Sequence, residues 1–387
     1  MRDGWVETSF GDIFKIVAGK YVAKEEYVEG GEFWIYGSNS IMGKLDRFLV
    51  EQSHVVMAAI GAYAGAVRYS KEPSWINNNA MALVPSEKVI AKYLHLWLES
   101  KFDLKRVVVG TGQPYVQRPL LLKEIIALPP LSEQKRIVDL ISSVDSYLGS
   151  LKTTLAKSIS ARKSALESQL DSFIKTSPIL RLEELCATGK SAIVDGPFGA
   201  NLKREDYLEE GVPVLKIQNI KQDYIVIKKM DFVSEAKYQE LRRHSFQNGD
   251  IIMTKLGDPL GLSAIVREID KGLIVADLVR IRPEKIDVEF LCMQLNSAKI
   301  QNYINRMQKG STRPRVNLGM IREMPIAVPS DSEIHDFVRV FGAWSQQNKK
   351  LEETIQSAEK LRSGLLSELL SGEHEIPTSY DKVMGAA

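Results

Sequence analysis

Cysteine and histidine are scarce in this chain of 387 residues. Cys186 and Cys292 are its two cysteines and lie far apart, so neither a disulfide framework nor a zinc knuckle is expected. The five histidines are scattered without the spacing of metal ligands. No apolar run approaches the roughly eighteen residues of a membrane span, and the first residues lack the apolar core of a signal peptide. The expected location is therefore a reducing cytoplasm.

Catalytic motifs are also missing. Adenine methyltransferases carry an Asp, Asn or Ser followed by two prolines and an aromatic residue, and the nearest strings, Asp195–Phe198 and Gly257–Leu260, do not match this tetrad. There is no P-loop, because the glycine-rich Gly61–Gly65 has a counterpart in Gly257–Gly261 that indicates a tight turn instead. We therefore expect a protein without a catalytic role, and without a metal or cofactor of its own.

Charge of one sign is not in excess either. The chain has 51 Lys and Arg against 49 Asp and Glu, a formal net charge of +2. Many nucleic-acid-binding proteins are more basic than this, but local patches matter more than the total. With 44% hydrophobic and 26% charged residues, the composition is that of a globular protein with room for two or three domains.

One phrase of the sequence occurs twice. Ile126–Val138 (IALPPLSEQKRIV) and Ile326–Val338 (IAVPSDSEIHDFV) share six of thirteen residues and start 200 positions apart. Three further blocks recur in the same order, at offsets that grow from 180 through 196 to 200. They are Lys24–Asn39 with Arg204–Asn219, Val55–Gly65 with Ile251–Gly261, and Gly110–Gln117 with Gly310–Asn317. Four blocks in one order indicate a tandem duplication with loop insertions.

A long amphipathic helix is predicted after each copy of the phrase. Pro129 and Pro130 end the extended segment before it, and Ser132 is the expected N-cap, with Glu133 in the first turn. Apolar residues then recur at spacings of four and three, as in a coiled coil. The residues expected at this seam are Ile137, Ile141, Val144, Leu148, Leu151 and Leu155, then a shifted stripe from Ile159, and Leu351, Ile355, Leu361 and Leu365 in the second copy.

The two helices are expected to pair with each other. A one-sided seam needs a partner, and each helix has one in its twin. The alternative is two independent helices packed on their own domains, which fits less well because about forty residues overreach a single domain.

Short apolar runs broken by Gly, Pro and Asn predict that the two globular halves are rich in β-strands. The predicted class is α+β: two tandem-duplicated β-rich domains, each followed by a long helix, with the helices paired as an antiparallel coiled coil. The predicted boundaries are 1–131 for the first domain, 132–175 for the first helix, 176–331 for the second domain, 332–372 for the second helix and 373–387 for a C-terminal tail.

Polar loops are the candidates for reading DNA. Arg matches guanine edges and Asn or Gln matches adenine edges, while Lys suits phosphates. The candidates in the first half are Asn39, Asn77, Asn78, Asn79, Gln113, Tyr115, Gln117 and Arg118. Those in the second half are Lys203, Arg204, Gln218, Asn219, Lys255, Arg313, Arg315 and Asn317. Any one of these loops alone could be a solvated turn, and it is their pairing across the duplication that favours DNA binding.

Several of these strings resemble the specificity subunits of type I restriction–modification systems. Leu128–Val138 before a long helix is similar to the start of that family's spacer helices. Asp195–Ile220 is similar to a frequent opening of its target recognition domains. Thr111–Gln117 and Gly310–Asn317 resemble the polar loop before the final strands. The likeness reaches to about Gly372.

This resemblance departs from the family in the second spacer motif, where Ser330, Asp331 and Ile334 replace Pro, Leu and Gln. It implies that each globular half is a target recognition domain that reads one part of a split, asymmetric DNA sequence. It also implies that the paired helices hold these domains apart and dock two modification subunits. Those subunits would carry S-adenosylmethionine for adenine methylation, and restriction subunits using ATP and Mg²⁺ would join them.

Two other functions stay open at this point. One is a specificity module of a related modification system outside type I, which a neighbouring gene would distinguish. The other is a coiled-coil adaptor with two β-rich heads and no DNA role, against which the polar loops argue. The missing motifs disfavour a stand-alone nuclease or methyltransferase.

Overall fold

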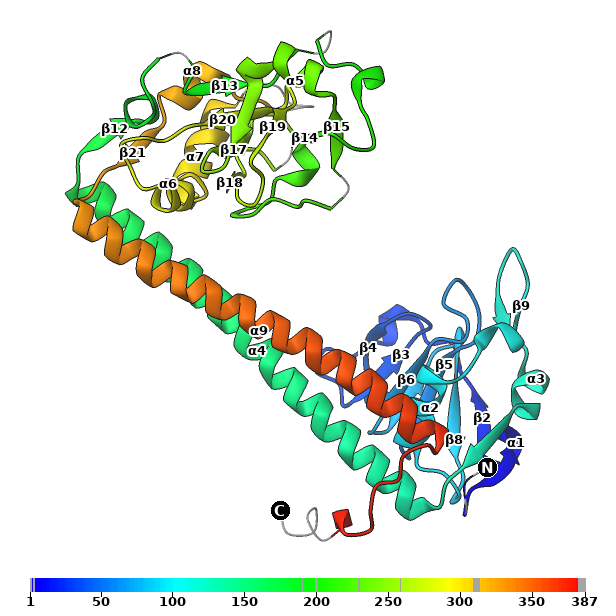
Figure 1. Cartoon of the computed structure of the whole chain (residues 1–387). Helices are drawn as coiled ribbons and strands as arrows, with labels where there is room; N and C mark the ends of the chain where they lie inside the picture. The colour runs from blue at the N-terminus through cyan, green and yellow to red at the C-terminus, as the bar shows by residue number, and fades with distance from the viewer. Residues whose placement is uncertain are drawn as a thin grey trace. The chain divides into compact units, whose positions relative to one another are not determined.

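The computed structural model describes residues 2, 4–189, 191–198, 201–228, 230–257, 259–308 and 314–381. They fall into two compact units, each holding one globular part and one end of two long helices (Figure 1). Unit 1 comprises Met1–Thr154 with Leu351–Ala387, and unit 2 comprises Leu155–Lys350. The long helices are α4, Leu131–Thr176, and α9, Asp331–Ser371.

Unit 1 is built on an antiparallel sheet of order β2-β8-β5-β6 and a smaller sheet of order β4-β3-β7, in which β3 and β7 are parallel. Strands β1 and β11 form an antiparallel pair next to α4, as do the short β9 and β10. The bounds are β1 Val6–Ser9, β2 Phe14–Ala18, β3 Phe33–Tyr36, β4 Ile41–Leu45, β5 His54–Ala58, β6 Val67–Ser70, β7 Ser74–Ile76, β8 Ala80–Pro85, β9 Val108–Val109, β10 Tyr115–Val116 and β11 Ile125–Leu128. Its short helices are α1 Phe10–Ile13, α2 Ala91–Ser100 and α3 Arg118–Lys123.

Strand β5 is apolar along most of its length because both of its faces are covered. Successive side chains of a strand point to opposite faces. Val55 and Met57 therefore join the core cluster that includes the residues of α2, while Val56 packs with Ile76 and Ala82 in a second cluster. The main core of unit 1 lies between this sheet, α2 and the adjoining ends of α4 and α9.

Unit 2 repeats the plan with a sheet of order β13-β20-β17-β18 and another of order β15-β14-β19-β16, in which β14 and β19 are parallel. Strands β12 and β21 pair as β1 and β11 do. The strand bounds are β12 Ile179–Arg181, β13 Ile193–Asp195, β14 Val212–Leu215, β15 Asp231–Val233, β16 Ser245–Gln247, β17 Ile251–Thr254, β18 Ser263–Ile265, β19 Lys271–Ile274, β20 Leu278–Ile281 and β21 Pro325–Ala327. The short helices are α5 Glu235–Glu240, α6 Val288–Leu295, α7 Ala298–Met307 and α8 Leu318–Arg322.

The register of the central strands shows the duplication. Val55 of β5 pairs with Leu83 of β8, and Ile251 of β17 pairs with Ile281 of β20. These partners stand 196 and 198 positions apart in the two copies, as the repeated blocks require. The predicted α+β fold, with two β-rich domains each followed by a long helix, is confirmed.

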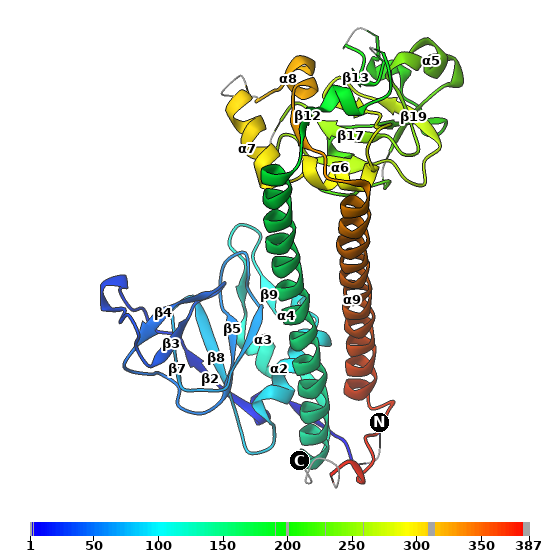
Figure 2. The same ribbon diagram turned by 90° about the vertical axis from the view of Figure 1, so that its left-hand side faces the viewer.

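The two long helices contact each other in antiparallel order within each unit, and both are uninterrupted (Figure 2). In unit 1, Asp145 of α4 forms an ion pair with Arg362 of α9. In unit 2, Ser158 donates to the side-chain oxygen of Asn348 at 2.6 Å and accepts from Trp344 Nε1 at 2.8 Å. No helix within the described ranges is long and apolar enough to cross a membrane.

The seam differs from the prediction at two positions. Ile159 is 48% exposed and Leu361 is 69% exposed, so the stripe does not shift to them. The spacing of three and four instead continues through the polar Ser158 on α4 and through Arg362 on α9, which both face the partner helix. The spacing of apolar residues could not predict these two positions, because hydrogen bonds and an ion pair, rather than apolar contacts, join them to the partner helix. The other predicted seam residues are buried or half-buried.

The starts of the helices also differ from the prediction by one residue. Helix α4 begins at Leu131, and its N-cap is not Ser132, because the Pro130 carbonyl accepts from the amides of Glu133 and Gln134 at 2.9 and 3.0 Å. Ser132 thus lies inside the first turn. The observed ranges 131–176 and 331–371 replace the predicted 132–175 and 332–372.

Candidate nucleic-acid interface

In unit 1, the polar loop at residues 113–117 meets the loops at residues 59–66 and 77–79 at one edge of the central sheet. The Gly61 amide donates to the Pro114 carbonyl at 2.8 Å, and the Val116 amide donates to the Ala59 carbonyl at 2.9 Å. The Ala59 amide in turn donates to the Asn79 carbonyl at 2.9 Å. Segments that lie far apart in the sequence are thereby joined into one surface.

Unit 2 makes the same three hydrogen bonds at the equivalent positions. The Gly257 amide donates to Pro314 at 3.1 Å, and the Val316 amide donates to Lys255 at 3.1 Å. The Lys255 amide donates to the Asp277 carbonyl at 3.0 Å. We call this surface the loop platform; it comprises residues 59–66, 77–79 and 113–117 in unit 1 and 255–257, 275–277 and 314–317 in unit 2.

Glycine is required at one turn of each platform. Gly61 has φ of +98° and Gly257 has φ of +99°, a backbone region that L side chains rarely adopt. The repeated Gly-x3-Gly spacing is therefore a turn requirement, as predicted, and it positions the amide that holds the polar loop.

Most of the predicted DNA-contacting residues are exposed, and many of them lie on the platforms. In unit 1, Gln117 is half-buried, and the exposed residues are Asn39, Asn78, Asn79, Gln113, Tyr115 and Arg118. In unit 2 the exposed ones are Lys203, Arg204, Gln218, Arg315 and Asn317, and Arg313 lies outside the described residues. Whether they contact bases stays a prediction.

Two predicted residues have a different position. Asn77 is 4% exposed and Asn219 is 2% exposed. The Asn77 side-chain oxygen accepts from the Asn78 amide at 2.6 Å. The Asn219 side chain accepts from the Lys216 amide and donates to the Val226 carbonyl, both at 2.9 Å. A buried amide with its partners in place stabilises a loop and is not free to read a base edge, so we correct these two assignments.

Lys203 and Arg204 do not lie on the platform. They belong to the turn of 3₁₀ helix η4, Arg204–Asp206, which an ion pair of 3.5 Å between Asp206 and Lys237 links to α5. Asn317 also has a local role, because its side chain accepts from the Met320 amide at 2.9 Å and caps α8.

The two platforms differ in charge at equivalent positions. Unit 1 has Ala59 where unit 2 has Lys255, whose Nζ lies 2.7 Å from a carboxylate oxygen of Asp195. Unit 1 has Tyr115 where unit 2 has Arg315, and both side chains are exposed. The same backbone thus presents an aromatic surface in one copy and a guanidinium group in the other.

Some exposed residues near the platforms carried no earlier prediction. In unit 1, Ile41, Met42 and Tyr63 are each about half exposed, at 47%, 45% and 51%. Apolar side chains of this kind contact the thymine methyl group in DNA complexes. In the sequence these are apolar residues beside turn glycines, a pattern that an ordinary strand also has, so the sequence could not identify them as candidates.

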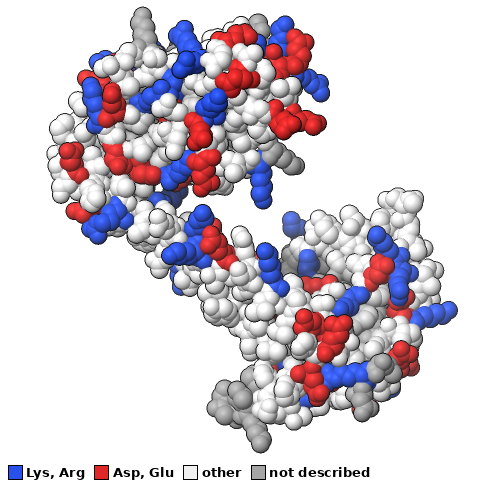
Figure 3. All heavy atoms as spheres, viewed as in Figure 1, with Lys and Arg blue, Asp and Glu red and all other residues white. Residues whose placement is uncertain are grey.

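Charge is mixed on the visible face of both units, where Lys and Arg alternate with Asp and Glu (Figure 3).

Burial raises the pKa of the Cys186 thiol to about 12 and holds the pKa of Cys292 well above its ordinary value, so both thiols stay protonated. Among the described residues, no group of three His, Cys, Asp or Glu is placed to hold a metal ion.

Comparison with known proteins gives the following matches. Residues 2–161 match the family model of the type I restriction modification DNA specificity domain. The specificity subunit of type I restriction enzyme MjaVIII from Methanocaldococcus jannaschii is 23% identical over 402 aligned positions, covering 94% of this chain and 92% of its own. The EcoBI specificity subunit from Escherichia coli is 24% identical, covering 88% and 74%.

A solved structure has the same fold. The S subunit of a type I restriction–modification system from M. genitalium superposes with a TM-score of 0.62 at 19% identity, covering 94% of this chain and 96% of its own.

Proposed function

We propose that this chain, a member of the family of type I restriction–modification specificity subunits, reads a split DNA target with one globular domain per half-site. It is the DNA-recognition subunit of such a complex and has no catalytic role. The observation that carries the split target is the duplicated loop platform. One backbone frame recurs with different exposed side chains, so two similar surfaces are suited to two different sequences.

The pairs of equivalent residues support different half-sites. Arg315 offers the bidentate donors that match guanine, and Tyr115 in its place offers an aromatic ring and a hydroxyl group. Gln113, Asn78 and Asn79 add amides that suit adenine. Since these differ between the copies, the target is expected to be asymmetric.

Specificity subunits of type I systems assemble with methyltransferase and restriction subunits. We propose that two modification subunits dock along α4 and α9. These helices expose large apolar side chains that a partner would cover: Tyr147, Ile159, Val340 and Leu361. S-adenosylmethionine would then belong to the modification subunits, and ATP and Mg²⁺ to the restriction subunits, in a cytoplasmic complex.

The test is to express this chain with the modification subunit encoded beside it, in a host without adenine methylation, and to sequence the host genome for modified adenines. The expected result is one split motif with two different halves and a gap of fixed length. The control is the modification subunit alone, which should leave the genome unmodified. No modification, with both proteins soluble and associated, would favour the adaptor function instead.

A further inference from the structure

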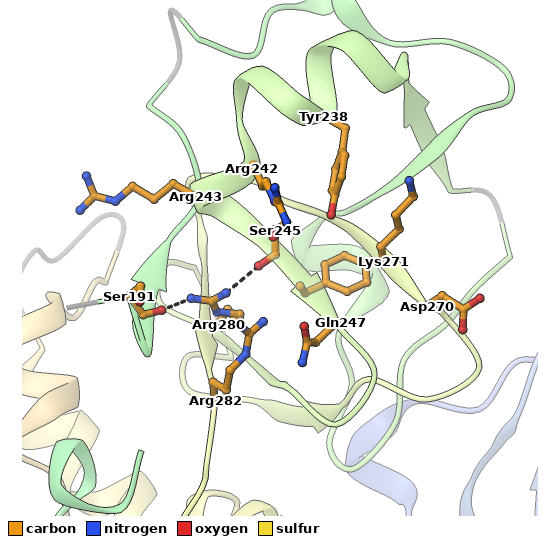
Figure 4. Close-up of a pocket in the computed structure, with 11 residues that line it drawn as sticks. Ser191, Tyr238, Arg242, Arg243, Ser245, Gln247, Asp270, Lys271, Arg280 and Arg282 are labelled. Carbon is orange, nitrogen blue, oxygen red and sulfur yellow. Dashed lines mark hydrogen bonds between the residues drawn. The ribbon is translucent and has the colours of Figure 1, made fainter. Parts of the chain in front are cut away.

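A hollow of about 320 Å³ opens on unit 2 between α5 and the adjoining strands β16, β19 and β20 (Figure 4). Tyr238 of α5 lies over it, and Gln247 of β16 lines its side. Five of its eleven lining residues are cationic: Arg242, Arg243, Lys271, Arg280 and Arg282. Figure 4 shows Arg243 extending away from the others, so four cations remain around the hollow.

Arg280 and Arg282 are two residues apart along β20 and its end, and therefore share one face. Arg282 is bound by Asp250, with both N–O distances at 2.7 Å. Arg280 is only 3% exposed, and no carboxylate among the described residues forms an ion pair with it. Its guanidinium donates to the carbonyls of Ser245, at 2.9 Å, and Ser191, and its Nε has no hydrogen-bond partner among the described residues.

The first copy shows that the fold does not need these arginines. The register of the sheet makes Ala82 the counterpart of Arg280 and Val84 the counterpart of Arg282. His54 stands where unit 2 has Asp250. Ala82 and Val84 belong to an apolar cluster in unit 1. The same strand therefore forms with small apolar residues, whereas burying a guanidinium costs desolvation.

The burial of Arg280 is incompletely offset. Its pKa is lowered first by burial and then by the positive charge of Arg282, although Asp250 opposes this. Hydrogen bonds and the charge of Asp250 raise the pKa of Arg282 instead. An anion in the hollow would stabilise both charges.

The hollow has an excess of positive charge. Lys271 forms an ion pair of 2.9 Å with Glu235, and Asp270 lies at the rim. Arg242 is exposed, and no carboxylate pairs with it in the described part of the chain. Arg280 and Arg242 thus remain for a ligand, with the Tyr238 hydroxyl and the Gln247 amide as further donors.

Two contacts through Asp195 link the hollow to the loop platform of unit 2. The turn that carries Arg242 ends at His244, whose Nδ1 lies 2.5 Å from the Asp195 carbonyl. Asp195 also holds Lys255, the first platform residue. On its other side, α5 is tied to η4, which presents the exposed Lys203 and Arg204. A DNA strand that continues from Lys255 along these contacts would reach this group of cations.

We infer that this hollow of unit 2 binds a phosphate group of the DNA backbone next to the half-site, held by Arg242 and Arg280. This inference rests on the proposed function. Guanidinium groups bind phosphate oxygens through paired, charge-assisted hydrogen bonds. The volume exceeds that of one phosphate and leaves room for water or the adjoining sugar. Such a contact fixes the position of the domain on the duplex and carries no sequence information.

The test uses the full chain in complex with its modification subunit. Affinity is measured over a range of salt concentrations, on a duplex with the methylated motif and on an unrelated duplex of equal length. Arg280→Ala restores the residue of the first copy, and Arg242→Ala changes an exposed side chain. Arg267→Ala is the matched control, because Arg267 is exposed in unit 2 but pairs with Glu289 outside the hollow.

Each of the two variants should lower the slope of log K against log salt by about 1, as loss of one phosphate contact does. Binding to both duplexes should weaken about five-fold near 0.15 M salt, since that slope is about 0.9 per phosphate. The methylated motif should stay the same, and the control variant should keep the wild-type slope and affinity. An unchanged slope for Arg242→Ala overturns the inference, whether or not Arg280→Ala folds.

A second arm separates DNA from free phosphate. Thermal unfolding of the wild type and Arg280→Ala is measured in inorganic phosphate and in chloride of equal ionic strength. Stabilisation of the wild type by phosphate, without any change in DNA slope for the variants, would assign the hollow to a free anion and overturn the DNA contact. If the wild-type complex does not prefer its target duplex, the proposed function fails, while the slope on the unrelated duplex still tests the hollow.

Discussion

Each unit builds its own sheet of the same plan, but from different side chains. Strands β8 and β20 have the same register and the same neighbours, yet Ala82 of the first is replaced by Arg280 in the second. The loops at the sheet edge keep their backbone hydrogen bonds while Tyr115 changes to Arg315. Because backbone pairing and turn glycines hold the frame, the side chains on its exposed edge are free to diverge.

The helix starts differ in a related way. In the second copy, the Ser330 amide and hydroxyl donate to the Glu333 carboxylate at 2.9 and 2.6 Å, which caps α9. In the first copy proline stands in place of Ser330, and the equivalent Glu133 accepts instead from Arg2 and Trp5 at 2.7 and 3.2 Å. The same glutamate of the repeated phrase thus caps one helix and anchors the N-terminal segment against the other.

The largest expected effect comes from shortening both helices together. Removing one heptad from each, 155–161 and 344–350, keeps the seam in register and shortens each helix by about 10 Å. At about 3.4 Å per base pair, the gap between half-sites should fall by about three base pairs while both half-sites stay the same. The methylated motif is read by genome sequencing. Replacing 155–161 by alanines at constant length is the control, and altered half-sites with an unchanged gap would contradict the account.

A smaller effect is expected from substitutions at the start of the central strand, where unit 2 has Asp250 and unit 1 has His54. Asp250 is 1% exposed and holds Arg282, so Asp250→Asn should lower the free energy of unfolding by about 3 kcal/mol. His54→Gln, at the neutral counterpart, should cost about 1 kcal/mol. Urea unfolding of the full chain measures both. Equal costs at the two positions would show that the charge pair has no role of its own.

The pH dependence of unit 1 should follow His95 of α2, whereas α6 of unit 2 has no histidine. Burial, with the charges of Lys92 and Arg362, lowers the pKa of His95 to about 4. The unfolded chain takes up this proton near pH 6.5, so stability present above that pH is lost as pH falls toward 4. From pH 7 to pH 5 the loss should be about 2 kcal/mol. Urea unfolding should show a smaller loss in His95→Gln than in the wild type, and the part that remains includes His54, whose pKa burial also lowers.

The smallest expected effect distinguishes the helix starts. Ser330→Ala removes a cap and should cost about 1 kcal/mol, whereas Ser132→Ala should change stability little because Ser132 caps nothing. Urea unfolding of the two variants gives the comparison. A cost at Ser132 equal to that at Ser330 would restore the N-cap first predicted for Ser132.

The sequence predicted the architecture because the repeated phrases mark strand cores, turn glycines and helix starts, which both copies need. It did not predict which side chains face inward. Apolar spacing cannot show that Ser158 and Arg362 complete the helix seam through polar contacts. Amides such as Asn219 look the same whether they hold a loop or read a base. For Arg280 the signal was present, as two arginines two residues apart in an apolar strand, but only the paired register shows that Ala82 is its counterpart.

The most direct test of the account places the first globular domain in both positions of the chain, with the helices kept, and sequences the methylated motif that results. If each copy of the frame reads its own half-site, the motif should become an inverted repeat of the first half with the gap unchanged. An unaltered, asymmetric motif would contradict the claim that one domain reads one half-site.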